Sequence, residues 1–101
     1  MKYQDLFSGL IRLHVLHHAS EHPVNGQWLM EELTHHGYSL GSGTIYPLLH
    51  SMVKKGYLVS HEEREGRSRK KLYTITPTGS QALKVAQKKV QELHDEMTEE
   101  H

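Results

Sequence analysis

The sequence contains no cysteine, which excludes a disulfide framework, a thiolate metal site and a cysteine nucleophile. Apolar residues make up 36% of its 101 residues, and no apolar run approaches the roughly 20 residues of a membrane span. The first residues, MKYQDLFSG, lack the pattern of a secretory signal peptide. We therefore expect a small cytoplasmic protein with no membrane partner.

A net charge is also lacking, because twelve basic residues balance twelve acidic ones. The two signs are nevertheless separated along the chain. Residues 64–71, REGRSRKK, carry five basic side chains and one acidic, whereas residues 92–100, ELHDEMTEE, carry five acidic side chains and no lysine or arginine. The average therefore hides two patches of opposite charge.

Hydrophobic periodicity predicts two helices in the first part of the chain. Residues 5–19 are apolar around most of the helix circumference, which indicates burial on more than one side. Pro23 ends this pattern. A second helix is predicted over 26–36, with Asn25 as its N-cap and Gly37 as its stop.

A third helix is predicted to begin with Ser42 as its cap and to end at Gly56, although a proline lies inside it. Its outward face combines a hydroxyl, an imidazole and a cation, the groups that meet base edges and phosphates in a DNA groove. Small residues at its start, GSGT, allow close approach of the backbone to a phosphate. The predicted DNA-binding residues of this helix are Ser42, Gly43, Thr44, Tyr46, Pro47, His50 and Lys54.

The period changes in the second half of the chain. Residues 58–63 and 71–76 read as short strands, and the segment REGRSRK between them predicts a β-hairpin with a basic tip. Arg67, Arg69, Lys70 and Lys71 are the predicted phosphate contacts of this tip. Thr76-Pro77 then opens a last helix, whose apolar residues recur at alternating spacings of three and four, as in a coiled-coil seam.

The predicted order of elements is three helices, a hairpin and a long helix. This order is typical of a winged helix-turn-helix followed by a dimerisation helix, a mainly α fold with a small β-hairpin. We expect residues 1–76 to form the DNA-binding domain and residues 77–101 to form the dimerisation helix.

Two segments of the chain resemble the PadR family of bacterial transcriptional regulators. They are GTIYPLLHSMVKKGYL (43–58), with the specific motif GTIYPLL, and EGRSRKKLYTITPTG (65–79). The resemblance spans roughly residues 6–83 and is to the compact members that have a single C-terminal helix. It implies a homodimeric repressor that binds a pseudo-palindromic operator in double-stranded DNA through the wing and the helix carrying Tyr46 and Pro47. It also implies that Pro47 is a feature of the family.

Compact members of this family dimerise by crossing the C-terminal helix over the first and last helices of the partner. This agrees with the two-sided first helix and with the seam of the last one. Some compact relatives hold flat aromatic ligands between these helices, but residues 83–97 contain no aromatic residue, so the identity of an effector stays open. The predicted dimerisation residues are Leu6, Phe7, Leu10, Leu83, Ala86, Val90, Leu93 and Met97.

Ten histidines are unusual for 101 residues. His14 and His18 have a spacing that could share a metal, but carboxylates near them are expected to be limited to Glu21. The adjacent rings of His17 and His18 are expected to point to different faces, as are those of residues 35–36. We therefore expect surface histidines, with no metal and no cofactor. No nucleophile elbow, phosphate loop or carboxylate pair occurs, so the chain is not expected to be an enzyme.

Two other functions stay open from the sequence alone. The zero net charge and the acidic tail allow a winged-helix module that binds a protein instead of DNA. The histidines allow a metal-responsive regulator, which would bind Zn²⁺ or Ni²⁺ through His14 and His18. The sequence names neither the operator nor the signal.

Overall fold

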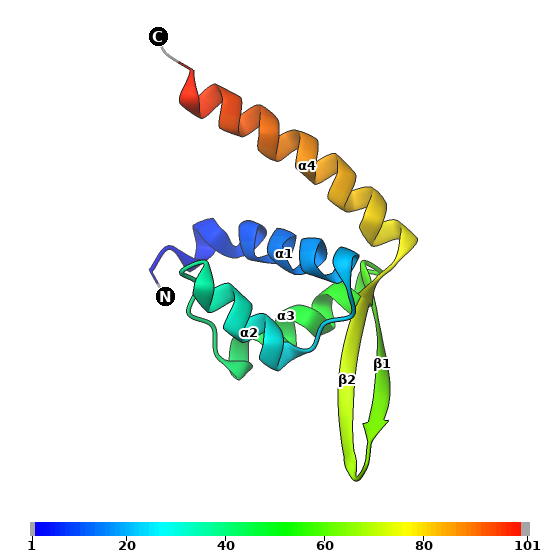
Figure 1. Ribbon diagram of the computed structural model, residues 1–101. Coiled ribbons are helices and arrows are strands. Elements are labelled where there is room, and N and C mark those ends of the chain that lie inside the picture. Colours follow the sequence, from blue (N-terminus) through cyan, green and yellow to red (C-terminus); the bar gives the residue numbers. More distant parts are fainter. Residues whose placement is uncertain (1, 100–101) are drawn as a thin grey trace.

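The computed structural model describes residues 2–99 and contains four helices and one two-stranded antiparallel sheet. In Figure 1 the helices that precede the hairpin lie together, the hairpin projects beyond them, and the last helix diverges from the first. These features confirm the predicted mainly α fold with a small hairpin. In chain order the elements are α1 (Gln4–Glu21), α2 (Gly26–His35), α3 (Ser42–Lys54), β1 (Leu58–Glu65), β2 (Ser68–Ile75) and α4 (Pro77–Thr98).

The helix boundaries lie close to those predicted, with one correction at α3. The Asn25 side chain caps α2 by accepting a hydrogen bond from the Trp28 N–H at 2.8 Å, and Gly37, with φ +87°, follows the end of this helix. Gly41 is the N-cap of α3, and no side chain caps this helix. The prediction that Ser42 is the cap was wrong, since Ser42 is already the first helical residue.

The hairpin, which we call the wing (residues 58–75), is longer than its sequence pattern indicated. Strand pairing continues from Leu58 opposite Ile75 to Glu65 opposite Ser68. Only residues 66–67 remain for the turn. Gly66 has φ +60°, which suits the first central position of a type II′ turn. The predicted basic tip is therefore mostly strand, because regular pairing extends through the charged residues.

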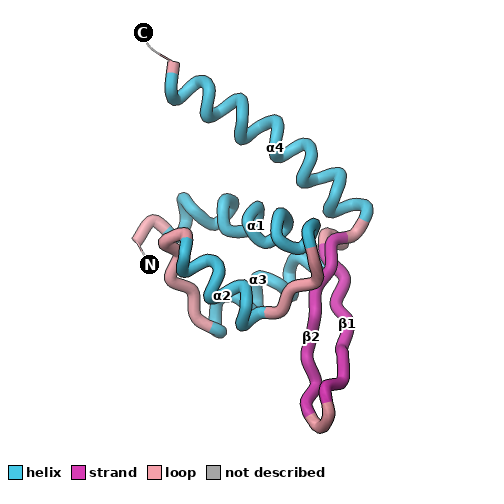
Figure 2. Tube along the Cα trace, viewed as in Figure 1, coloured by secondary structure: helices cyan, strands magenta, loops and turns pink. Residues whose placement is uncertain are grey.

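The core draws apolar side chains from every element of the described chain, and α4 contributes Leu83. Backbone hydrogen bonds in both directions between Val24 and Tyr73, at 2.8 and 3.0 Å, attach the link between α1 and α2 to the edge of β2 (Figure 2). The wing is thereby anchored to the helices at its base. Within residues 2–99, no helix is long and apolar enough to cross a membrane.

The start of α4 is fixed by Thr76, its N-cap. The Thr76 hydroxyl accepts a hydrogen bond from the Gly79 N–H at 2.9 Å and donates one to the Gly56 carbonyl at 2.5 Å. Gly79 is packed so closely that an added Cβ would collide with the Tyr57 carbonyl oxygen. These contacts set the direction in which α4 leaves the wing.

Candidate nucleic-acid interface

One face of α3 is fully exposed. A rotation of 100° per residue places Gly43, Pro47, His50 and Lys54 in one row, opposite the buried stripe of the same helix. All four are exposed. We call this row the α3 stripe. The buried residues opposite it are Ile45, Leu48, Leu49 and Met52.

Pro47 changes the hydrogen bonding of this face without ending the helix, which continues to Lys54. A proline has no N–H, so the carbonyl of Gly43, four residues earlier, lacks its usual helical donor. Ser42 and Gly43 are exposed at the first turn, where backbone N–H groups have no helical acceptor. The stripe therefore offers both backbone donors and a backbone acceptor to a partner.

Tyr46 and Thr44 lie on the two flanks of the stripe. Tyr46 is 44% exposed, and its ring lies over Gly26, where an added Cβ would come within 2.5 Å of it. Burial raises the pKa of Tyr73, and the Tyr46 phenol raises it further. Thr44 is half-buried and lines a groove of about 360 Å³ between α1 and α3.

The alternation of side chains along paired strands separates the wing cations into two faces. One face continues the core-facing side of the hairpin, where Tyr73 is buried. The other face points away from the core. Only Arg67 lies in the turn, so the prediction that four cations form one basic loop was wrong. The core-side face carries Arg64, Arg69, Lys71 and Glu62, and the opposite face carries Lys70, Glu63 and Glu65.

The core-side face is the basic one. It has three cations against one carboxylate, while the opposite face has one cation against two. Arg64 lies directly opposite Arg69, an arrangement that is unfavourable unless an anion approaches the pair. Glu62 neutralises part of this charge through an exposed ion pair with Arg69 at 3.7 Å. The Lys71 Nζ lies 5.9 Å from the centre of the Tyr73 ring.

The predicted dimerisation residues divide into exposed and packed groups. Phe7 packs against the core, where it meets the ring of Tyr38 edge to face, and Leu83 belongs to the core itself. Ala86 is half-buried. The exposed members lie on α1 and along α4, and they are Leu6, Leu10, Val90, Leu93 and Met97.

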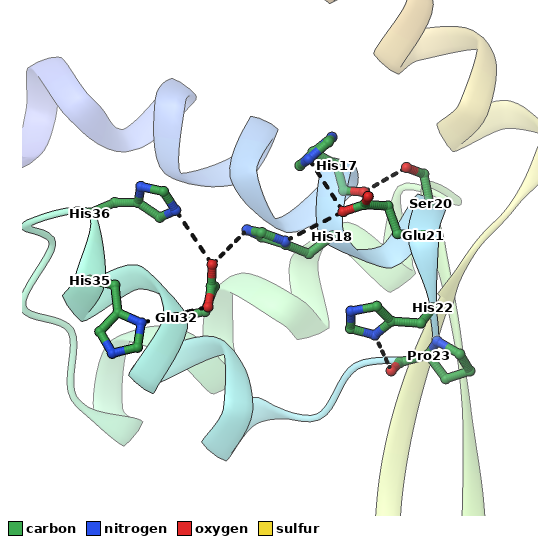
Figure 3. Close-up of polar contacts among 9 residues, drawn as sticks. All are labelled: His17, His18, Ser20, Glu21, His22, Pro23, Glu32, His35 and His36. Carbon is green, nitrogen blue, oxygen red and sulfur yellow. Dashed lines mark hydrogen bonds and ion pairs between the residues drawn. The ribbon is translucent and has the colours of Figure 1, made fainter.

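A second polar cluster joins α1 to the end of α2. Figure 3 shows the Glu32 carboxylate pointing between histidines from both segments. Its Oε1 lies 3.8 Å from His18 Nε2 and 3.5 Å from His36 Nε2. His14 stacks beside them, with its ring centre 4.7 Å from that of His36. We call His14, His18, His36 and Glu32 the histidine junction.

Two expectations about the histidines need correction. His18 is 8% exposed and is therefore not a surface histidine. Adjacent rings do differ in their surroundings, since His18 is buried and His17 exposed, and His36 packs beside His14 while His35 is more exposed. Sequence reasoning also missed Glu32, which is distant from His18 along the chain. The sequence did offer one signal, because residues four apart on a predicted helix, such as Glu32 and His36, are neighbours.

Burial favours the neutral form of two rings of the histidine junction. Loss of solvent contact lowers the pKa of His14, and the neighbouring His36 and His18 lower it further. Burial also lowers the pKa of His18, although Glu32 acts in the opposite direction. A neutral imidazole keeps a lone pair available to a metal ion.

Known proteins match both the sequence and the fold. The sequence profile of the "Transcriptional regulator PadR-like family" matches residues 15–85. The transcriptional regulator Rv3488 of Mycobacterium tuberculosis is 43% identical over 88 residues, which cover 86% of this chain and 81% of that protein.

Two solved structures extend the comparison. A PadR family transcriptional regulator from Eggerthella lenta superposes with a TM-score of 0.75 at 28% identity, covering 96% of this chain and 93% of that one. A PadR family transcription regulator from Clostridium difficile superposes with a TM-score of 0.80 at 21% identity, covering 86% and 93% of the two chains. The second likeness concerns the fold alone.

Proposed function

This chain belongs to the PadR-like family of transcriptional regulators, and from that premise we propose that it is a homodimeric repressor that binds a pseudo-palindromic operator. Membership makes it a DNA-binding regulator and not an enzyme. The dimer, the repressor role and the form of the operator are the parts we propose. The resemblance of the GTIYPLL and EGRSRKKLYTITPTG segments supports them.

The observation that carries the proposal is that an exposed polar stripe on α3 and a basic face of the wing occur together, with α3 in contact with β1. Tyr46, on the flank of the stripe, packs on Gly26 of α2. The stripe supplies an imidazole and backbone groups for base edges. The wing face supplies cations for phosphates, and the opposed Arg64 and Arg69 favour an anion between them. Together they form the DNA-facing surface.

Ser42 and Thr44 support this surface from the first turn of α3, where a phosphate would be attracted by free backbone N–H groups. Lys54, at the other end of the stripe, is positioned for a flanking phosphate. Arg67, at the wing tip, extends furthest along the hairpin and would contact a phosphate or a minor groove. In this proposal Lys70 contributes least, because it lies on the acidic face.

The dimer is supported by two properties of α4. Val90, Leu93 and Met97 are exposed along one seam, and Leu6 and Leu10 of α1 are exposed as well. The helix is also basic in its first half, with lysines at 84, 88 and 89, and acidic in its second half, at 92, 95 and 96. Two antiparallel copies of such a helix bring opposite charges together.

We therefore propose that residues 1–76 bind DNA and that residues 77–101 dimerise; residues 1 and 100–101 lie outside the described part of the chain. Two-fold symmetry predicts half-sites about one or two helical turns apart. A repressor of chromosomal genes acts in the cytoplasm, where we expect this protein to work.

Fluorescence anisotropy with DNA from upstream of the protein's own gene tests the function. We expect sub-micromolar affinity, at least tenfold preference over a shuffled sequence of the same composition, and a steep decrease with salt. Equal and weak binding to both fragments would show that this fragment is not the operator. An absence of binding even at low salt would contradict the proposal and would favour the protein-binding module.

A further inference from the structure

We propose that the histidine junction is a metal site, in which His14, His18 and His36 bind one divalent transition-metal ion of the zinc type. The Glu32 carboxylate lies beside two of the three rings and contributes negative charge to the site. The proposal concerns binding alone and does not depend on DNA recognition.

The geometry brings three imidazole nitrogens together from two segments of the chain. One ring nitrogen from each of His14, His18 and His36 lies within 4.8 Å of the others. A tetrahedral zinc ion with Zn–N bonds of about 2.0–2.1 Å holds its donors roughly 3.4 Å apart. Side-chain rotations that move the donor nitrogens by about an ångström would therefore bring them to zinc-binding distance. His36, which is exposed after the end of α2, has room for such a rotation.

A buried polar atom without a partner points to a ligand at this place. The Nε2 of His18 is shielded from solvent and makes no hydrogen bond to any described residue. Its distance of 3.8 Å from Glu32 Oε1 is too long for one. Edge-to-face packing of His18 on Trp28, with ring centres 5.3 Å apart, holds the ring in this orientation. Coordination of a cation would satisfy the buried nitrogen.

Glu32 lies on the same side of the His18 ring as the proposed donor nitrogen. Its Oε1 is 3.8 Å from His18 Nε2 and 3.5 Å from His36 Nε2, and Figure 3 shows the carboxylate directed between these two rings. A negative charge this close to the donor nitrogens offsets part of the charge of an incoming cation.

The donor set selects the class of metal. Three imidazoles with a nearby carboxylate suit Zn²⁺, Ni²⁺, Co²⁺ or Cu²⁺, while Mg²⁺ and Ca²⁺ require oxygen donors. The absence of cysteine leaves no thiolate to favour Cu⁺. An open fourth position is available to water. The ion would connect α1 to the end of α2, which precedes α3.

A second group of histidines is a weaker candidate. His17, His18 and Glu21 also have donor atoms within 4.8 Å of one another. All three lie on α1, however, and the side chains of His17 and Glu21 are 53% and 56% exposed. The two groups share His18, so one ion can use only one of them. The more enclosed group that joins two segments is the one we propose.

Calorimetric titration of the full chain with ZnCl₂, after removal of metals by a chelator, tests the proposal. We expect one Zn²⁺ per chain. His36→Ala is the main variant, because His36 is exposed and its loss should leave the fold intact, as circular dichroism would verify. We expect it to weaken Zn²⁺ binding at least about 100-fold because a ligand is lost, and Glu32→Gln to weaken it by a smaller factor because a neighbouring negative charge is lost.

Two control variants keep the test specific. His17→Ala removes a ligand of the alternative group, and His94→Ala removes a histidine far along α4; both should bind Zn²⁺ within about twofold of the native chain. Zn²⁺ should also raise the thermal midpoint of the native chain and leave that of His36→Ala unchanged, since a ligand of the folded state stabilises it. The proposal would be overturned if His36→Ala bound Zn²⁺ like the native chain, or if His17→Ala lost as much affinity.

Discussion

The α3 stripe and the histidine junction hold their polar groups in opposite environments. Every residue of the stripe is exposed, whereas His18 in the junction is buried with one nitrogen unpartnered. An exposed polar group without a protein partner is hydrogen-bonded to water and costs little folding free energy. A buried polar atom without a partner costs about 1–3 kcal/mol. DNA would therefore add function to the stripe, while a metal ion would add both function and stability to the junction.

The largest effect is expected at α4, because the stripe needs two copies to read a two-fold operator. Val90→Asp places a carboxylate in the proposed dimer seam, where an uncompensated buried charge costs about 3–5 kcal/mol. We expect the dimer dissociation constant to rise roughly 100-fold or more, measured by sedimentation equilibrium. Val85→Asp is the matched control, since Val85 is exposed on the opposite face of the same helix. Equal effects of the two substitutions would contradict the seam.

The next effect is expected at the stripe itself. His50→Ala removes a side chain proposed to contact a base edge, which is worth about 1–3 kcal/mol. Operator affinity should therefore fall roughly 5- to 150-fold, with little change for shuffled DNA, in anisotropy titrations. His61→Ala removes an exposed histidine from the far face of the wing and should leave both affinities unchanged. A loss shared equally by both DNAs would remove His50 from sequence recognition.

Two adjacent lysines of the wing lie on faces of opposite charge. Lys71 lies on the basic, core-side face and Lys70 on the acidic one. Lys71→Ala should weaken binding to all sequences severalfold and reduce the slope of log affinity against log salt by about 1, because a phosphate contact is lost. Lys70→Ala should change the slope less. If Lys70→Ala has the larger effect, the wing presents its other face to DNA.

A smaller effect is expected at the histidine junction, where a substitution should stabilise the metal-free protein. His18→Leu removes the unpartnered nitrogen and fills the same space with apolar atoms, so the metal-free protein should become more stable by about 1 kcal/mol. For a domain of this size, that gain corresponds to a rise of about 4–8 °C in the thermal midpoint. His17→Leu, at an exposed position of the same helix, should give no such gain. A lower midpoint for His18→Leu would show that the imidazole has a structural role instead.

The smallest effect is a dependence of stability on pH. Burial lowers the pKa of His14 and of His18 in the folded protein, so below the unfolded value of about 6.5 the unfolded chain binds more protons. Stability should be full above this pH and should decline as the pH falls toward the lowered values. Thermal midpoints between pH 7.5 and 5.5 measure it, and His18→Leu should decline less. The charged or titratable groups around the two rings are His17, Glu21, Glu32 and His36.

The sequence predicted the helices and the wing because each has a local signal. Periodicity locates the buried stripe of α3, and Asn25 and Thr76 cap the helices as their side chains suggest. The division of the wing cations needed the strand register, because a register slip of one residue moves every side chain of a strand to the other face. The register is fixed by the position of the turn, which the structure places at Gly66 and Arg67.

The histidine junction could not be assembled from local patterns. His14 and His18 are neighbours on one helix, and Glu32 and His36 are neighbours at another, so each half was visible separately. Their meeting depends on how α1 packs against α2 after the chain turns at Pro23. A carboxylate that appeared remote in the sequence is therefore the one that contacts the buried ring.

Hydroxyl-radical footprinting of the native protein on its own upstream DNA tests whether a dimer presents two α3 stripes to the operator. A dimer that presents two α3 stripes should protect two patches related by two-fold symmetry, with centres about 10 or 20 base pairs apart. Backbone protection should extend outward from each patch where the wings lie. A single unsymmetrical patch, or protection spread evenly along the fragment, would contradict a dimeric winged-helix regulator with a pseudo-palindromic operator.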